Sequence, residues 1–166
     1  MVEAALEINH WCAGEVMYQG TDMRTGSALE IYRSGVGRCG EEAVFVVNVM
    51  RSAGIPARPV YVPRWSHCDD NHAWVEVWCD GDWHYLGACE PEAVLDKSWF
   101  TNAASRAMMI GSRWYDRAMP DEKVIGKDGM NRIINLLGKY AKTRWITITV
   151  EDLDGTPAAG AKYGLR

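Results

Sequence analysis

A glycine-flanked cysteine at the start of a helical stretch constrains this chain more than any other feature. Residues 37–42 read Gly-Arg-Cys-Gly-Glu-Glu, and apolar residues then recur at helical spacing as far as residue 53. Gly54 and Pro56 predict the end of this helix. Cys39 is therefore expected in its first turn, where unpaired N–H groups and the helix dipole favour a thiolate. The position suits a nucleophile; the competing interpretation is a small buried core residue, the more frequent fate of a free cysteine.

His72 is the best-placed histidine for the base that a thiol nucleophile needs. It is the first residue of the segment 72–78, in which every residue suits a β-strand, and it follows a polar loop at 63–71. Because side chains alternate along a strand, His72 and Trp74 are expected on the same face. Packing at the surface or in the core is the alternative for any single histidine.

A hairpin is expected directly after this strand. Asp80-Gly81 is typical of a two-residue turn, and residues 83–87 have the pattern of a returning strand. With that turn, Trp78 would lie opposite Trp83.

The other periodic segments predict further elements around this centre. Helices are expected at 2–19, near 28–32 and, from the spacing of Met130, Ile133, Ile134 and Leu137, within 121–142; strands are expected at 58–62 and 145–150. We therefore predict one domain over residues 1–143. Residues 144–166 are predicted to form a β-hairpin that begins a separate, truncated β-sandwich module.

Composition excludes some classes of function. The 166 residues carry a net charge of −4, which gives no reason to expect nucleic acid or an anionic membrane as a partner. No apolar run is long enough to span a bilayer, and residues 1–30 lack the pattern of a secretory leader. The abrupt end of the chain suggests a piece of a longer protein with further domains. The compartment therefore stays open, with an extracytoplasmic location expected for an excised domain.

No disulfide framework, metal or cofactor is expected. The five cysteines are scattered and odd in number, so at least one thiol is free. Residues 67–72 read His-Cys-Asp-Asp-Asn-His, which is rich in potential ligands. This segment nevertheless lacks the paired spacing of a structural zinc site and has no distant second pair.

Taken together, several blocks resemble the transglutaminase-like core, a superfamily of transglutaminases, bacterial cysteine-protease-like proteins and peptide:N-glycanases. The blocks are Gly-Arg-Cys-Gly-Glu-Glu-Ala from residue 37, Gly-Ile-Pro-Ala-Arg from 54, Asn-His-Ala-Trp-Val-Glu-Val-Trp from 71, and Gly-x-Trp from 81. They span residues 37–90, about a third of the chain. The resemblance implies a papain-like α+β fold, in which N-terminal helices carrying Cys39 pack on an antiparallel sheet carrying His72. It also implies that Cys39 is the nucleophile and His72 the base.

The third residue of the family's catalytic triad departs from the pattern. The family places an aspartate just after the Gly-x-Trp strand, where this chain has Gly87. The following Ala-Cys-Glu resembles the peptide:N-glycanase stretch, so the substitution lies inside a good match. We expect Glu90 to replace the missing acid through a bend at Gly87. The residues of 69–71, Asp-Asp-Asn, remain alternatives.

Charged neighbours predict an ion pair at the site. Arg38 is expected to lower the pKa of Cys39, and Asp69 and Asp70 to raise that of His72, which would favour a thiolate beside an imidazolium. The Cys39 backbone N–H is expected to bind the oxyanion.

Tryptophans are expected to line the substrate groove. Trp11, Trp65 and Trp74 are our candidates for substrate binding, with Trp11 as a possible second donor to the oxyanion. Core packing is the alternative for each of these rings.

These observations predict a thiol-dependent amide hydrolase or acyltransferase with a thioester intermediate. The expected substrate is a peptide, or more narrowly a glycopeptide at its glycan-linked asparagine. The alternative is a catalytically impaired peptide- or glycan-binding module on the same scaffold, because Gly87 stands where the third acid belongs.

Overall fold

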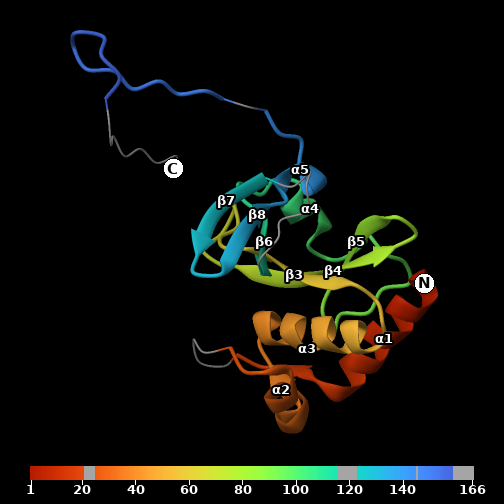
Figure 1. Ribbon diagram of the computed structural model, residues 1–166. Helices are drawn as coiled ribbons and strands as arrows, with labels where there is room; N and C mark the ends of the chain where they lie inside the picture. Colours follow the sequence, from red (N-terminus) through yellow and green to blue (C-terminus); the bar gives the residue numbers. More distant parts are fainter. Residues whose placement is uncertain (21–24, 116–122, 145, 159–166) are drawn as a thin grey trace.

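A computed structural model shows three helices stacked against one face of an antiparallel sheet (Figure 1). It describes residues 1–20, 25–115, 123–144 and 146–158. The elements are α1 Val2–Glu15, β1 Met17–Tyr18, α2 Ala28–Ser34, β2 Val36–Gly37, α3 Cys39–Ser52, β3 Ala57–Val62, β4 His72–Cys79, β5 Asp82–Leu86, α4 Thr101–Ala104, β6 Gly111–Tyr115, β7 Lys123–Asp128, β8 Asn131–Asn135 and α5 Leu137–Tyr140. The predicted α+β fold, with a cysteine-bearing helix on a histidine-bearing sheet, is confirmed.

Helix α3 begins at Cys39, as the sequence predicts, and lies between the sheet and the other N-terminal helices. It packs against β3 and β4 on one side and against α1 and α2 on the other (Figure 1). Glu41 fixes its start: its carboxylate accepts hydrogen bonds from the backbone N–H groups of Arg38 at 3.1 Å and Gly26 at 3.0 Å. Gly54 then adopts a φ of +82°, which ends the helix.

Within the described ranges, the main sheet has six antiparallel strands in the order β5-β4-β3-β6-β8-β7. The predicted hairpin between β4 and β5 is confirmed: Asp80 and Gly81 form the turn, and Trp78 lies opposite Trp83. In the pairing of β3 with β4, Val62 lies opposite His72. This register puts His72 at the first position of β4, beside the start of α3.

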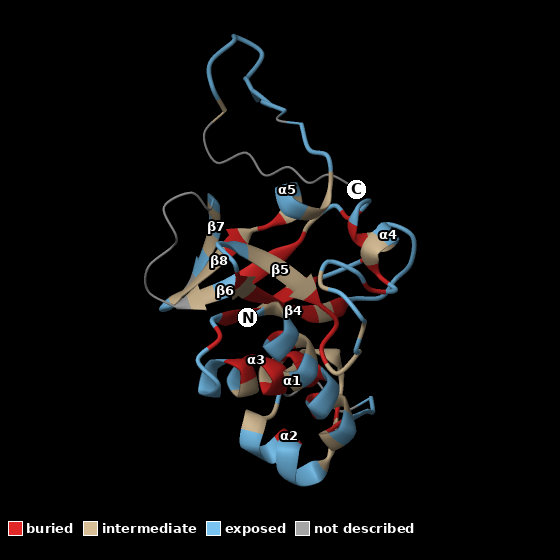
Figure 2. Ribbon diagram, turned by 90° about the vertical axis from the view of Figure 1, so that its right-hand side faces the viewer, coloured by how far each residue is buried: buried red, intermediate tan, exposed pale blue. Residues whose placement is uncertain are grey.

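The sheet separates two hydrophobic cores. Val75 and Val77 of β4 face the helices, whereas Trp74 faces the opposite core with Phe100 and Ile134. Figure 2 shows buried residues concentrated in α3 and the central strands. The alternation expected for 72–78 is therefore observed.

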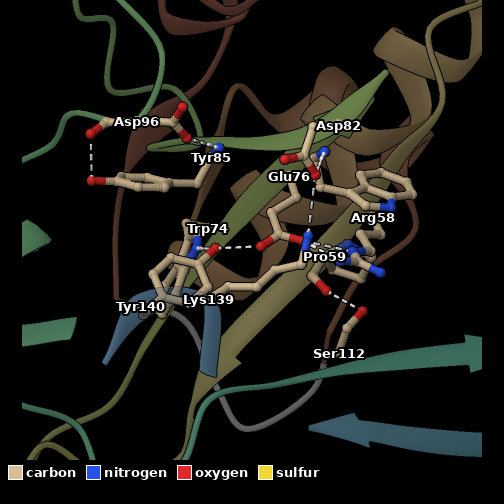
Figure 3. Close-up of polar contacts among 11 residues, drawn as sticks. Arg58, Pro59, Trp74, Glu76, Asp82, Tyr85, Asp96, Ser112, Lys139 and Tyr140 are labelled. Atoms are coloured by element: carbon tan, nitrogen blue, oxygen red, sulfur yellow. Dashed lines mark hydrogen bonds and ion pairs between the residues drawn. The ribbon is translucent and has the colours of Figure 1, made fainter. Parts of the chain in front are cut away.

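A buried ionic network joins β3 to β4 on the face away from the helices (Figure 3). Arg58 and Glu76 are directly opposite in the two strands and form an ion pair at 2.6 Å, with side chains that are 0% and 2% exposed. The Tyr140 hydroxyl donates to the other oxygen of Glu76 at 2.6 Å, and the Trp74 indole N–H donates to Tyr140 at 2.9 Å. The Trp83 ring covers the Arg58 guanidinium at 4.1 Å. The pair thus holds a fixed geometry between the two strands that position the site.

The prediction of a helix within residues 121–142 is wrong. Residues 123–128 and 131–135 form the β7–β8 hairpin, and among the described residues of this range only 137–140 is helical. Gly129 has a φ of +57° in the turn, which a glycine adopts without strain. The apolar spacing that suggested a helix instead combines a turn residue, Met130, with two residues of β8, Ile133 and Ile134, and the first residue of α5, Leu137.

The C-terminal segment leads away from the rest of the chain (Figure 1). An isolated bridge joins Glu151 to Pro157, while residues 145 and 159–166 of the expected hairpin lie outside the described residues. The domain boundary at 143/144 and the separate module stay predictions. Within the described ranges, no helix has both the length and the apolar character needed to cross a membrane.

Replacing Glu76 by alanine should lower the free energy of unfolding by about 3–5 kcal/mol, because the buried Arg58 charge loses its partner. The double variant Arg58→Met/Glu76→Leu, with apolar side chains of similar volume, should recover most of that loss. Urea unfolding followed by tryptophan fluorescence measures both. A single variant as stable as the wild type would contradict the assignment, and so would a double variant no more stable than the single.

Candidate active site

Cys39 and His72 line the same two clefts. The first, here called the α3–β3 cleft, has a volume of about 950 Å³ and includes Val44, Val47, Arg51, Val60, Tyr61 and Arg113. The second, here called the aromatic cleft, has a volume of about 620 Å³ and includes Tyr18, Trp65, Asp70, Glu90 and Trp99. Arg38, Cys39, Asn71 and His72 belong to both. The thiol and the imidazole therefore lie where the clefts meet.

The Cys39 thiol is half-buried in the first turn of α3. Burial raises its pKa above the ordinary value for cysteine. Backbone N–H groups of Ala73 and Gly40 hydrogen-bond the sulfur and lower its pKa, as does the Arg38 charge, but burial outweighs them. The contact with Ala73 ties the start of α3 directly to β4. In this structure the neutral thiol is the favoured form.

The His72 imidazole is packed among aromatic rings. Trp99 and Phe100 lie 4.8 and 5.1 Å from it, centroid to centroid, and Trp65 lies at 6.3 Å. This burial lowers the pKa of His72 to about 4, although the nearby Asp70 charge opposes the change. The prediction of a thiolate–imidazolium pair is therefore wrong. Arg38 lowers the pKa of Cys39 and Asp70 raises that of His72, as expected, but burial has the larger effect on both and favours a neutral thiol and a neutral imidazole.

Glu90 is the carboxylate beside the imidazole. Its Oε2 lies 3.9 Å from His72 Nε2, which has no hydrogen-bond partner among the described residues. The same oxygen accepts a hydrogen bond from the Trp99 indole N–H at 2.9 Å. Burial raises the pKa of Glu90, and the bond from Trp99 opposes that rise. The carboxylate is therefore close to Nε2, at a distance longer than a hydrogen bond.

Gly87 provides the space that Glu90 occupies. A Cβ added to Gly87 would clash with Glu90 Oε2 and would lie 2.8 Å from Glu90 Cβ. Cys89 adopts a φ of +56°, and the Glu90 N–H donates to the Gly87 carbonyl at 3.2 Å, so the chain turns back on itself. The Glu90 carboxylate consequently lies where the side chain of residue 87 would begin.

Asn9 of α1 holds this turn and was missed by the sequence analysis. Its side-chain amide donates to the Gly87 carbonyl at 2.9 Å, and its carbonyl accepts from the Cys89 N–H at 3.1 Å. Asn9 is only 1% exposed. A polar residue on the apolar stripe of a helix, between Ala5 and Cys12, was the available signal.

Glu42 and Trp99 were also missed. Burial, followed by the negative charge of Glu90, raises the pKa of Glu42 to about 8, so this carboxyl is largely protonated at neutral pH. It therefore adds little negative charge near Cys39. Trp99 comes from a loop whose sequence carries no periodic signal, and only the folded chain shows its bond to Glu90.

The three tryptophans expected in the groove have different positions. Trp65 lines the aromatic cleft. Trp74 is completely buried and lines neither cleft, so in this structure it cannot touch a substrate. Trp11 packs against Tyr32 and Phe45 on the helical side and also lines neither cleft. The structure thus places Trp74 beside the His72 ring, 6.1 Å away centroid to centroid, but in neither cleft, and it places Trp11 in neither cleft.

The described residues include no group of three or more His, Cys, Asp or Glu side chains that could hold a metal ion. The ligand-rich segment 67–72 thus forms no such group within the described ranges.

Residues 1–88 match the family model of the transglutaminase-like superfamily, which is more than half of the chain. The chain belongs to the transglutaminase-like superfamily. The match contains both Cys39 and His72 and ends two residues before Glu90. The acid beside the imidazole therefore lies outside the matched segment.

Two solved structures are similar to this transglutaminase-like chain. LapG from Legionella pneumophila is 17% identical, with a TM-score of 0.47, over 57% of this chain and 58% of LapG. A candidate cysteine protease from Cytophaga hutchinsonii is 19% identical, with a TM-score of 0.45, over 79% of this chain and 51% of that protein. The chain thus spans little more than half the length of either. No curated protein matches it.

Alkylation of Cys39 by iodoacetamide should accelerate steadily with pH, with no plateau near neutrality, because burial disfavours both the thiolate and the imidazolium. Peptide mapping by mass spectrometry follows Cys39 separately from the exposed thiol of Cys68, which serves as an internal control. A reactive plateau between about pH 5 and 8 that disappears in His72→Ala would show a resting ion pair and contradict this expectation.

Proposed function

We propose that this protein is a thiol-dependent amide hydrolase or acyltransferase in which Cys39 is the nucleophile and His72 the base. The observation that supports this most is the placement of a helix-start thiol and a buried imidazole on the walls of the same clefts, within a transglutaminase-like chain. A peptide amide is the proposed substrate, with a glycan-linked asparagine as the narrower option.

In the first half of the reaction, the sulfur attacks the carbonyl carbon while His72 accepts the thiol proton. A C–S bond forms, and the carbonyl oxygen becomes an oxyanion near the Cys39 backbone N–H. When this intermediate collapses, the C–N bond breaks and His72 gives its proton to the leaving amine. The acyl group is left as a thioester on Cys39.

In the second half, water or a second amine attacks the thioester. His72 accepts the proton of the attacking group, and the Cys39 sulfur leaves and is reprotonated. Water gives hydrolysis and an amine gives acyl transfer. Because the resting groups are both neutral, the imidazolium forms only during attack on the bound substrate.

Glu90 is proposed as the positioning acid of this pair. A carboxylate beside Nε2 favours the tautomer in which Nε2 carries the proton and Nδ1 is free to accept one from the thiol. It would also stabilise the imidazolium during the reaction. The 3.9 Å separation must shorten for a hydrogen bond, as is common when a substrate closes a site. Gly87 supports this role, because any larger side chain there would displace the Glu90 carboxylate.

A binding module without catalysis is the second candidate, favoured by the same 3.9 Å separation. In that case, the clefts would hold a peptide or glycan while Cys39 forms no thioester. Wild-type protein and Cys39→Ala would then bind the same peptides equally, and neither would release an amine.

Moving the acid to its usual position in the family tests the role of Glu90. On a library of peptide 7-amino-4-methylcoumarin amides, Glu90→Ala should lower kcat/KM by about 10²–10⁴-fold, because the imidazole loses the acid that fixes its tautomer. Gly87→Asp alone should also be impaired by its clash with Glu90. The double variant Gly87→Asp/Glu90→Gly, which also removes the Cβ at residue 90 that would lie 2.8 Å from the new one, should regain much of the activity.

Glu92→Ala is the matched control, since Glu92 lies in the same loop and pairs with Lys97 instead. Each variant is compared by its pH–rate profile and its melting temperature. The role of Glu90 is excluded if Glu90→Ala retains wild-type kcat/KM. It is also excluded if the double variant folds normally and remains as inactive as Glu90→Ala.

A further inference from the structure

The α3–β3 cleft is lined by positive charge, although the chain as a whole is acidic. Three arginines line it, Arg38, Arg51 and Arg113, and none of its lining residues within the described ranges is an aspartate or glutamate. The chain as a whole nevertheless carries a net charge of −4. The positive charge is therefore concentrated in a cleft that reaches the nucleophile.

Arg51 and Arg113 can each present a guanidinium to a ligand. Arg51, in the last turn of α3, donates from Nε to the Ala57 carbonyl at 2.9 Å, which anchors the group; toward the described part of the chain this bond uses one of its five N–H donors. Arg113 is exposed, and its guanidinium carbon lies 6.0 Å from the centre of the Tyr61 ring. That ring limits its position without occupying its donors.

Part of the wall of this cleft is aliphatic. Val44 and Val47 come from α3, and Pro59 comes from β3. Such a wall buries hydrocarbon, while the guanidinium groups form paired hydrogen bonds with a carboxylate. The volume of about 950 Å³ is in the upper part of the range for ligand pockets.

The aromatic cleft on the other side of Cys39 has the opposite character. Asp70 and Glu90 line it together with Tyr18, Trp65 and Trp99. A substrate peptide that runs through both clefts, past Cys39, would therefore contact a basic, aliphatic wall on one side and an acidic, aromatic wall on the other. This asymmetry fixes a direction for the substrate.

We propose that the α3–β3 cleft binds an aliphatic peptide segment bearing a side-chain carboxylate, on one side of the amide that Cys39 attacks. Arg51 and Arg113 hold the carboxylate, and the valines hold the neighbouring apolar side chains. The position of this segment beside the amide that Cys39 attacks rests on the proposed function. The binding of the segment requires only the cleft.

Binding is measured apart from catalysis with the Cys39→Ala protein and fluorescein-labelled hexapeptide pools. One pool carries Asp or Glu among Ala, Val and Leu, a second carries Asn or Gln at the same positions, and a third carries Lys. Fluorescence anisotropy should give about tenfold tighter binding for the acidic pool than for the amide pool, as expected for a charge-assisted contact. Raising the salt concentration should reduce the difference.

Arg51→Gln and Arg113→Gln should each remove most of that preference, and the double variant should remove all of it. Arg106→Gln is the matched control, because Arg106 is exposed, also donates from Nε to a backbone carbonyl and lines neither cleft. Arg106→Gln should bind like its parent. Equal binding of the acidic and amide pools overturns the inference, and so does a preference that persists in the double variant.

An acidic pool carrying a vinyl sulfone separates the two proposals in otherwise wild-type protein. Labelling of Cys39 that falls in the Arg51→Gln/Arg113→Gln variant supports both. Selective binding without any labelling of Cys39 keeps the cleft inference and counts against the proposed function. If an amide pool carrying the same vinyl sulfone labels Cys39 as well as the acidic pool does, the result supports Cys39 as the nucleophile and overturns the cleft inference.

Discussion

The buried ion pair between Arg58 and Glu76 is the interaction on which the position of the base depends. Removing two charges from water costs several kcal/mol per ion, and only a well-placed, hydrogen-bonded pair offsets that cost. The pair therefore favours a single register of β3 against β4, in which Val62 lies opposite His72. A slip of one residue would turn His72 and its neighbours to the wrong faces of the sheet.

The turn after Gly87 shows how the space of a missing side chain can be filled from elsewhere in the chain. Gly87 leaves room, Cys89 turns the backbone, and Glu90 returns its carboxylate to the vacated space. Asn9, from the first helix, bonds to both ends of this turn. The N-terminal helix thus supports the turn that carries Glu90 to the neighbourhood of His72.

Local patterns predicted the elements that carry Cys39 and His72, because helix α3 and the hairpin after His72 depend on periodicity and turn residues close in sequence. The strands at 123–128 and 131–135 were missed because Ile133 and Ile134 of the second strand fit a helical spacing with Met130 and Leu137, which lie outside both strands. The ionisation of Cys39 and His72 could not be predicted from nearby charges. It depends on burial by distant residues such as Trp99, which only the folded chain brings together.

The claim that Glu90 has taken over the positioning of His72 is tested most directly by the nitrogen-15 chemical shifts of the His72 ring near neutral pH. Since its pKa is about 4, the ring is neutral there and must adopt one tautomer or a mixture. The Glu90 carboxylate beside Nε2 predicts the Nε2–H tautomer, with a shift toward a mixture in Glu90→Gln. A predominant Nδ1–H tautomer, or shifts that Glu90→Gln leaves unchanged, would contradict the claim.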